Sequence, residues 1–176
     1  MSPKPVVFLN FDNALAIHRF SDNVRVLDAD AKAIIDAFPD IWLDLLDTNA
    51  LRNLHALHRD FEPSYVISSS WTSHLNLEEM GRMLKRCGLK FVALNLRKQW
   101  CTPRNQTPGR LSEIEAWFEL EAWGDDHAYV IIDDHVSGAA LSGSWLEGRT
   151  VFCDTRVGFS EAKLVEARQI LQSPCR

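Results

Sequence analysis

The sequence has few of the residues that mark the special classes of protein. Its four cysteines are scattered without a CxxC pair, and no short group of histidines and cysteines has the spacing of a zinc site. With eight glycines and seven prolines, it is neither collagen-like nor of low complexity. We therefore expect no disulfide framework and no structural zinc. A protein of a reducing compartment, the cytoplasm, is predicted.

Excess basic charge and long hydrophobic runs are also missing. Nineteen lysines and arginines face 24 acidic residues, and the formal net charge of −5 does not favour a nucleic-acid partner. A nucleic-acid site would have to be local, and Arg97, Lys98 and Arg104 are the basic residues that could serve one, although a solvated loop is the simpler interpretation. The first apolar run, 6–9, is too short for a signal peptide or a membrane span. No membrane partner is expected.

What remains is the composition of an ordinary globular protein. Of 176 residues, 46% are hydrophobic and 24% are charged. A chain of this length can bury a substantial core, and it matches the usual size of one domain. We predict a single domain over residues 1–176.

Short apolar runs recur along the chain at places where buried strands would fit. Four of them are rich in β-branched or aromatic residues and precede polar residues: 6–9, 65–67, 129–132 and 150–153. The run 91–94 is a fifth, weaker candidate. These runs predict five strands.

Between the runs, apolar residues recur with the helical period of about 3.6. Stripes of this kind predict helices over 51–61, 77–87, 111–122 and the segment after Ser160. The second stripe follows Asn76, with Glu79 three residues later, which is the pattern of a capping box. Residues 13–47 and 95–109 are predicted to be irregular. Strands alternating with helices predict an α/β fold with a doubly wound, mainly parallel sheet.

Polar residues follow several of the predicted strands. In a doubly wound sheet the ligand crevice lies beyond the carboxyl ends of the strands, so these residues are the candidates for chemistry. They are Asn10, Asp12, Ser68, Ser69, Ser70, Asp133, Asp134 and Asp154. Carboxylates brought together suit Mg²⁺, and a serine hydroxyl with a guanidinium beside them suits phosphoryl oxygens.

Four segments at these positions resemble the motifs of the haloacid dehalogenase (HAD) superfamily. Residues 6–15, VVFLNFDNAL, resemble the first motif, a strand followed by DxDG. The second, third and fourth motifs are resembled by ISSSW at 67–71, RLSEIEAW at 110–117 and IIDD at 131–134. The residues of these segments are closest to those of the small HAD domains associated with RNA-repair proteins.

The resemblance implies a HAD-like Rossmannoid fold. Its sheet would have five mainly parallel strands in the order 3-2-1-4-5. Neither the interval between the first two motifs nor that between Arg110 and Asp133 can hold a large cap domain. The expected crevice is therefore open to a phosphorylated end of a macromolecule as well as to a small ester.

The resemblance also implies catalytic roles. Asn10 occupies the position of the nucleophile that attacks phosphorus, and Asp12 that of the general acid and base. Ser68, with Ser69 as the less favoured alternative, would hydrogen-bond a phosphoryl oxygen. Arg110 would replace the lysine that neutralises the phosphoryl group, although it could instead be a surface residue paired with Glu113 or Glu115.

The metal site implied by the resemblance holds Mg²⁺. Its ligands would be Asn10, the main-chain carbonyl of Asp12, Asp133 and, as an auxiliary, Asp134. An Asp pair taken alone could equally end a strand and cap a turn. Trp71, next to the serines, could stack on a substrate base or belong to the core.

Asn10 departs from the superfamily pattern. A neutral amide is a very poor nucleophile, and it removes one anionic ligand from the metal site. Three explanations stay open: an engineered substitution, drift to an inactive binding protein, and a site that uses direct attack by water. Asn13 stands where the superfamily has glycine, and this second change favours natural divergence.

Two functions follow from the residues and the resemblance. The first is a magnesium-dependent phosphatase-type hydrolase acting on a phosphate ester, impaired or inactive in this chain because of Asn10. The second is a non-catalytic HAD-fold protein that binds a phosphorylated ligand or a protein partner.

Overall fold

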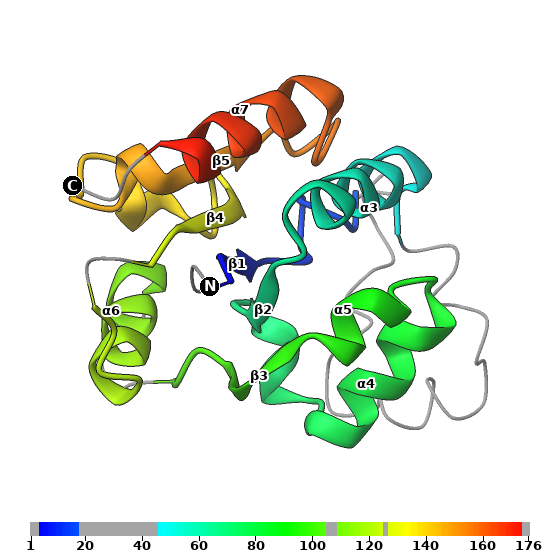
Figure 1. Ribbon diagram of the computed structural model, residues 1–176, viewed down its shortest axis with the longest axis horizontal. Helices are drawn as coiled ribbons and strands as arrows, with labels where there is room; N and C mark the ends of the chain where they lie inside the picture. The colour runs from blue at the N-terminus through cyan, green and yellow to red at the C-terminus, as the bar shows by residue number, and fades with distance from the viewer. Residues whose placement is uncertain (1–3, 18–45, 105–108, 125–126, 174–176) are drawn as a thin grey trace.

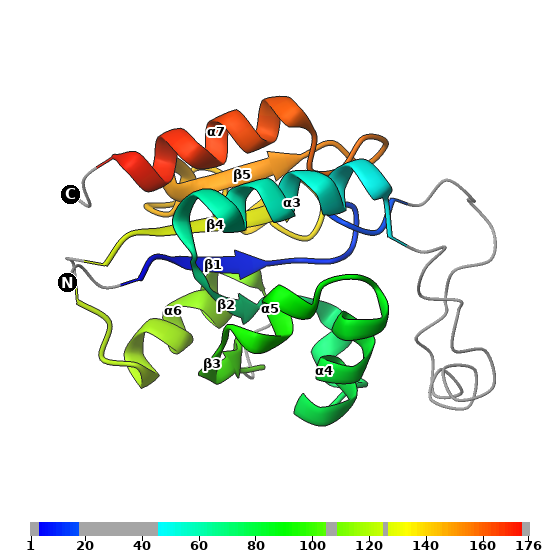
Figure 2. The same cartoon turned by 45° about the vertical axis from the view of Figure 1, so that its right-hand side comes forward.

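A five-stranded parallel sheet forms the centre of the protein. The computed structural model describes residues 4–17, 46–104, 109–124 and 127–173. The strands are β1 (Val6–Leu9), β2 (Ser64–Ile67), β3 (Leu96–Cys101), β4 (Tyr129–Asp134) and β5 (Thr150–Cys153). They lie in the order β3-β2-β1-β4-β5, and every neighbouring pair is parallel (Figures 1 and 2). The predicted α/β class and strand order are confirmed.

Helices connect the strands, as the apolar stripes predict. They are α3 (Thr48–Phe61), α4 (Leu77–Arg86), α5 (Lys90–Leu94), α6 (Arg110–Leu120) and α7 (Glu161–Gln172), with the short 3₁₀ helices η1 (Ser70–Ser73), η2 (Ala139–Leu141) and η3 (Glu147–Arg149). The predicted capping box is present, since Asn76 accepts from the Glu79 backbone and Glu79 accepts from the Asn76 backbone. Ser160 caps α7 by accepting the backbone N–H of Lys163.

The sheet separates two apolar clusters, because successive strand residues point to opposite faces. On one face, Val7 and Leu9 of β1 pack in a cluster that includes buried residues of α3, α4, α5 and α7. On the other face, Val6 and Phe8 pack with α6 and η2, and the rings of Phe8 and Trp117 lie 5.0 Å apart edge to face. All four residues of β1 are fully buried, so the strand lies inside the sheet with helices on both sides.

The third strand is not where the sequence pattern predicts it. Residues 91–94 are helical and belong to α5, and Leu94 is exposed. The strand β3 instead lies within 95–109, a range whose sequence predicts irregular structure. It is an edge strand with no fully buried residue and the polar sequence LRKQWC, so a search for buried apolar runs misses it. Its pairing with β2 is also irregular in register.

The turn after β1 places Asp12 at the edge of the sheet. Asn13, which stands where the superfamily has glycine, adopts a left-handed conformation with φ 58°, which asparagine tolerates. Further along, the backbone N–H of Phe159 donates to Ala14 O at 2.8 Å. Residues 18–45, most of the predicted irregular stretch 13–47, lie outside the described residues. Among the described residues, no helix has the length and apolar character needed to cross a membrane.

Gly158 allows the segment after β5 to approach the turn after β1 closely. Its φ is 69°, and an added Cβ would lie 2.7 Å from the carbonyl oxygen of Ala14. Gly143 has a similar φ of 74° but no atom within 4 Å of the corresponding Cβ position. The two glycines share a backbone conformation and differ in their surroundings.

We therefore predict that Gly158→Ala destabilises the protein more than Gly143→Ala. Gly143→Ala should cost about 1 kcal/mol for the left-handed conformation alone, and Gly158→Ala about 3 kcal/mol, because the backbone must also move. Urea unfolding of the two variants measures this difference. Equal losses would contradict the close contact with Ala14.

Candidate active site

The candidate residues converge at the carboxyl edge of the sheet. Asn10 directly follows β1, and its backbone N–H donates to Ile132 O in β4 at 3.0 Å. Ser68 directly follows β2 and donates its backbone N–H to Leu9 O at 2.9 Å. Asp133 and Asp134 are the last two residues of β4. The residues that the sequence places at separate strand ends thus lie at the ends of neighbouring strands, and their side chains are buried.

The amide nitrogen of Asn10 lies at the meeting point of three oxygen atoms. Nδ2 donates to Asp133 Oδ1 at 2.7 Å, to Asp134 Oδ2 at 3.1 Å and to the main-chain oxygen of Asp12 at 3.1 Å. Oxygen would repel these acceptors, so the chemistry requires nitrogen at this point. The amide oxygen, Oδ1, is buried and has no hydrogen-bond partner in the described part of the chain.

The acid pair, Asp133 and Asp134, is surrounded by further donors. Asp133 Oδ1 also accepts the backbone N–H of Asp134 at 2.8 Å, and Asp133 Oδ2 accepts from Arg110 Nε at 2.6 Å. Asp134 Oδ1 accepts the backbone N–H groups of Val136 at 2.7 Å and Ser137 at 3.1 Å. Each of the four carboxylate oxygens therefore has at least one donor, although neither side chain reaches solvent.

Arg110 is part of this buried group. It is the first residue of α6, and its guanidinium bridges Asp133 Oδ2 and Glu113 Oε2, the latter at 3.0 Å from Nη1. The expected pairing with Glu113 is present, but the alternative of a surface residue is wrong, because only 8% of Arg110 is exposed. One buried guanidinium thus lies between two buried carboxylates.

Burial changes the titration of the acid pair. Removal from water raises the pKa of Asp133 to about 6, since the charged form loses hydration. The Arg110 charge and the hydrogen bond from the Asp134 backbone oppose this rise in pKa, while the Asp134 charge adds to it. The net direction means that the donors around Asp133 do not fully replace water.

Asp12 is held at the mouth of the site by two neutral donors. Ser70 Oγ donates to Asp12 Oδ2 at 2.8 Å, and Trp71 Nε1 donates to Asp12 Oδ1 at 2.9 Å. The ring of Trp71 packs 4.9 Å from that of Phe11, and Trp71 is 4% exposed. The expectation that Trp71 could stack on a substrate base is not supported, because its ring lies in the core. Trp71 is instead a donor that fixes the carboxylate of Asp12.

The three serines after β2 have different surroundings. Ser69 caps η1, where its Oγ accepts from the backbone of Trp71 at 3.5 Å, and Ser70 contacts Asp12. The hydroxyl of Ser68 is buried and, within the described residues, has no hydrogen-bond partner. Buried hydroxyls usually have partners, so among the three serines Ser68 is the one whose hydroxyl the described residues leave unsatisfied.

Some residues of the site are not found by motif inspection. Glu113, Ser70 and Trp71 lie within the motif-like segments, but the sequence does not indicate that Ser70 and Trp71 donate to Asp12 or that Glu113 is buried with Arg110. It does not single out Gly138, yet a Cβ there would lie 2.8 Å from Asp134 O and 3.2 Å from Asp133 Cγ. A glycine shortly after an acid pair is the available signal, because close backbone approach favours glycine.

Asp154, the remaining strand-end candidate, does not join the site. Its Oδ1 accepts the backbone N–H of Arg156 at 2.8 Å, in an exposed turn after β5. The residue therefore ends a strand and stabilises a turn, which is a common role of aspartate.

The donor set fits magnesium only in part. Carboxylate and carbonyl oxygens are the ligands that Mg²⁺ prefers, and three of them converge on one point. The amide nitrogen of Asn10 fills that point, and an N–H donor cannot coordinate a cation. Nor do His, Cys, Asp and Glu residues, as far as the structure describes them, form a group of three that could hold a metal. As the side chains stand, the residues do not fit Mg²⁺.

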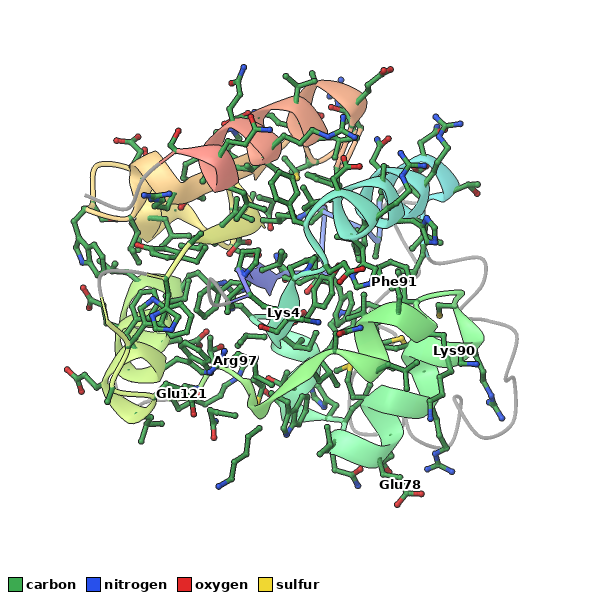
Figure 3. The ribbon with its side chains drawn as sticks, in the orientation of Figure 1. Lys4, Glu78, Lys90, Phe91, Arg97 and Glu121 are labelled. Atoms are coloured by element: carbon green, nitrogen blue, oxygen red, sulfur yellow. The ribbon has the colours of Figure 1, made fainter. Side chains whose placement is uncertain are left out.

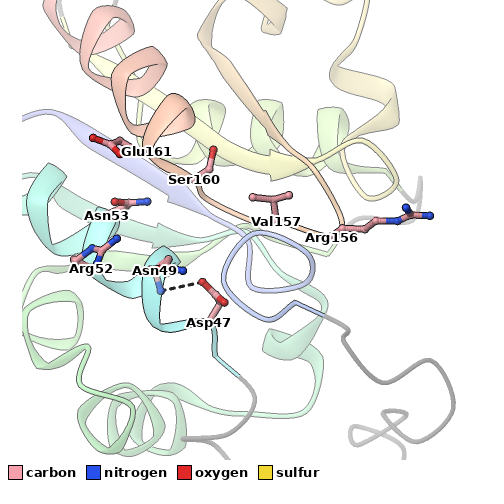
Figure 4. Close-up of a pocket in the computed structure, with 8 residues that line it drawn as sticks. All are labelled: Asp47, Asn49, Arg52, Asn53, Arg156, Val157, Ser160 and Glu161. Atoms are coloured by element: carbon pink, nitrogen blue, oxygen red, sulfur yellow. Dashed lines mark hydrogen bonds between the residues drawn. The ribbon is translucent and has the colours of Figure 1, made fainter.

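A pocket of about 300 Å³ lies between the first turns of α3 and α7. Its lining residues are Asp47, Asn49, Arg52, Asn53, Arg156, Val157, Ser160 and Glu161. It contains none of the predicted site residues. Figure 4 shows its two arginines on opposite sides, and its two acids balance their charge. The pocket is therefore not a concentrated anion site.

The local basic residues are partly used within the fold. Arg97 of β3 pairs with Glu121 at 3.0 Å, and Figure 3 shows the two side chains together near the end of α6. Its guanidinium also lies within 5.5 Å of the ring centres of Trp117 and Trp123. Arg104 donates to the main-chain oxygen of Ser69 at 3.2 Å. These contacts give both arginines a structural role.

Comparison with known proteins identifies the family of the chain. A family model described as the HAD domain in Swiss Army Knife RNA repair proteins matches residues 6–164. No curated protein and no solved structure gives a significant match to the chain. The matched range includes the acid pair and all the residues that donate to it.

The raised pKa of Asp133 predicts a measurable pH dependence in chelator-containing buffer. In the unfolded chain Asp133 titrates near its ordinary pKa of 3.8, and in the folded protein near 6. The folded state therefore binds more protons between these values, and the contribution of Asp133 to stability falls as pH rises through this window. Relative to Asp133→Asn, the wild-type free energy of unfolding should fall by about 2 to 3 kcal/mol from pH 4 to pH 7. A difference between the two proteins that does not change with pH would contradict the assignment.

Proposed function

Because the chain belongs to the family of HAD domains in Swiss Army Knife RNA repair proteins, we propose that it has the phosphate-ester site of a HAD-type hydrolase in an impaired form. In this form the site binds a phosphorylated ligand but does not carry out covalent turnover. Membership of the family supports a HAD-type hydrolase at the level of the superfamily. Three further points are our proposal: that the substrate class is a phosphate ester, that the activity depends on magnesium, and that this chain has lost turnover.

The position of Asn10 carries this proposal. The residue occupies the place of the superfamily nucleophile, but its nitrogen donates to the acid pair and its oxygen belongs to a neutral amide. An amide in this place cannot form the aspartyl phosphate on which the covalent route depends. The carboxylates around it and the guanidinium of Arg110, which is paired with Asp133, support the proposal that the rest of the site is retained.

Two groups support recognition of a phosphoryl group. The buried hydroxyl of Ser68 would donate to a phosphoryl oxygen and so gain a partner. Arg110 would supply the positive charge that lysine supplies in other HAD proteins. We also propose that residues 1–176 form one domain without a large cap. The site would then be open both to a phosphorylated end of a macromolecule and to a small ester.

Magnesium dependence is proposed for a form with aspartate at position 10. The superfamily generally uses Mg²⁺, which neutralises negative charge on the phosphoryl group. The carboxylate introduced by Asn10→Asp would hold it together with the Asp12 carbonyl, Asp133 and Asp134. In the wild-type protein the Asn10 amide takes that place. Asp12, fixed by Ser70 and Trp71, would exchange a proton with the leaving group or with water.

The cellular compartment is proposed from the cysteines. None of Cys87, Cys101 and Cys153, the described cysteines, is in a disulfide. This agrees with a reducing compartment, and we propose the cytoplasm.

The activity of Asn10→Asp tests the proposed function. We expect no turnover of p-nitrophenyl phosphate or of a nucleotide panel by the wild-type protein, because it lacks a nucleophile. Asn10→Asp should gain magnesium-dependent turnover, since it adds the nucleophile beside the proposed acid, the proposed phosphate-binding groups and the acid pair. Asn53→Asp, a buried asparagine outside the site, serves as the matched control and should stay inactive. If Asn10→Asp shows no turnover in magnesium, the hydrolase proposal is wrong. If the wild-type protein shows turnover, the reaction must proceed by direct attack of water.

The role of Ser68 is tested in the same active background. Ser68→Ala should lower kcat/KM of Asn10→Asp about tenfold, the value of one hydrogen bond to a charged oxygen. Ser69→Ala should have a smaller effect, because the Ser69 hydroxyl caps η1 instead. Steady-state kinetics compare the two. A larger loss for Ser69→Ala would reassign the phosphate contact.

A further inference from the structure

We propose that the side-chain amide of Asn10 is a built-in replacement for the cation of the site. Nδ2 holds the acid pair and the Asp12 carbonyl together, so the site is assembled without magnesium and does not bind it. The inference concerns the assembly of the apo site and goes beyond the proposed function, since it holds whether or not any phosphate ester is bound or hydrolysed.

The position of the Asn10 nitrogen is the position that a cation would need. Nδ2 lies 2.7 Å from Asp133 Oδ1 and 3.1 Å from both Asp134 Oδ2 and the Asp12 main-chain oxygen. A magnesium ion bound by the same oxygens would sit at about 2.1 Å from each of them. The nitrogen and the ion would thus need the same small volume between the three oxygens. Both cannot be present while the amide faces inward.

The hydrogen bonds of Asn10 join segments that the other donors do not join. Arg110 Nε and the backbone N–H groups of Val136 and Ser137 each reach a single carboxylate of the pair. Asn10 Nδ2 reaches both carboxylates and also the main-chain oxygen of the turn after β1. Without the Asn10 amide, the main-chain oxygen of Asp12 and the carboxylates of the acid pair would face one another with no donor between them. Buried acceptors without donors destabilise a fold.

The charge of the buried cluster favours a neutral residue at position 10. Asp133, Asp134 and Glu113 are buried, and among the described residues the salt bridges of this group come from the guanidinium of Arg110, which pairs with Asp133 and Glu113. Aspartate in place of Asn10 would add another buried carboxylate and would replace the N–H donors with oxygen. Such a cluster needs a cation, because like charges at this distance repel strongly in a buried site. Asparagine at position 10 therefore has two effects: the acid pair no longer needs a cation, and the site loses its nucleophile.

Thermal unfolding with and without magnesium tests the proposal independently of activity. The proteins are wild type, Asn10→Asp and the control Asn53→Asp, whose side chain contacts Phe159 O outside the site. In EDTA, Asn10→Asp should melt about 10 °C below wild type, because it buries an uncompensated carboxylate. Magnesium chloride should recover most of that loss, as a ligand that binds only the folded state does.

The controls separate a cation effect from general destabilisation. Wild type should shift by less than about 1 °C between EDTA and magnesium, since it offers no site. Asn53→Asp should be destabilised in both buffers and gain nothing from magnesium. The proposal is overturned if magnesium raises the Tm of wild type as much as that of Asn10→Asp. It is also overturned if Asn10→Asp and wild type have the same Tm in EDTA.

A second measurement decides the matter if Asn10→Asp does not fold. The Asn10 side-chain NH₂ signals of ¹⁵N-labelled wild type report the donor directly. We expect them to exchange slowly with solvent and to stay unchanged during titration with magnesium chloride. A saturable shift of these signals with magnesium would overturn the proposal. Because neither measurement uses turnover, an inactive Asn10→Asp that is stabilised by magnesium would count against the proposed function alone.

Discussion

The burial of two adjacent carboxylates at the end of β4 is the constraint that shapes this edge of the protein. Asp133 and Asp134 are completely removed from water, so every one of their oxygens needs a donor within the fold. Donors come from the residue after β1 through Asn10, from α6 through Arg110 and from the turn after β4 through its backbone. Three elements distant in sequence are thereby tied to one point.

The same constraint connects the site to its function. A cation would satisfy these carboxylates in an active hydrolase of the superfamily, and it would also prepare the site for a phosphoryl group. Here an amide satisfies them, so the protein keeps the architecture of the site without requiring a metal. The buried hydroxyl of Ser68 has no hydrogen-bond partner among the described residues, and the carboxylate of Asp12 is fixed by Ser70 and Trp71. Under the proposed function, the single side chain of Asn10 removes turnover and leaves ligand binding.

Much of the fold and the position of the site follow from the sequence, for identifiable physical reasons. Central strands such as β1 are buried on both faces and are therefore apolar throughout, and strand ends bring Asn10 and the acid pair together. The edge strand β3 has no fully buried residue and the polar sequence LRKQWC, so it lacks the apolar run that reveals the central strands. The partners of Asp12 and the burial of Arg110 depend on side-chain directions across segments, which spacing along the chain does not encode. The roles assigned to the site residues stay predictions.

The central claim is that an amide nitrogen stands where a cation would otherwise be held. A high-resolution crystal structure of the wild-type protein, grown in magnesium chloride, tests it most directly. We predict the Asn10 side chain at the meeting point of Asp12, Asp133 and Asp134, with hydrogen-bond distances near 3 Å and no ion. An octahedral ion at that point, about 2.1 Å from Asn10 Oδ1 and Asp133, would contradict the claim.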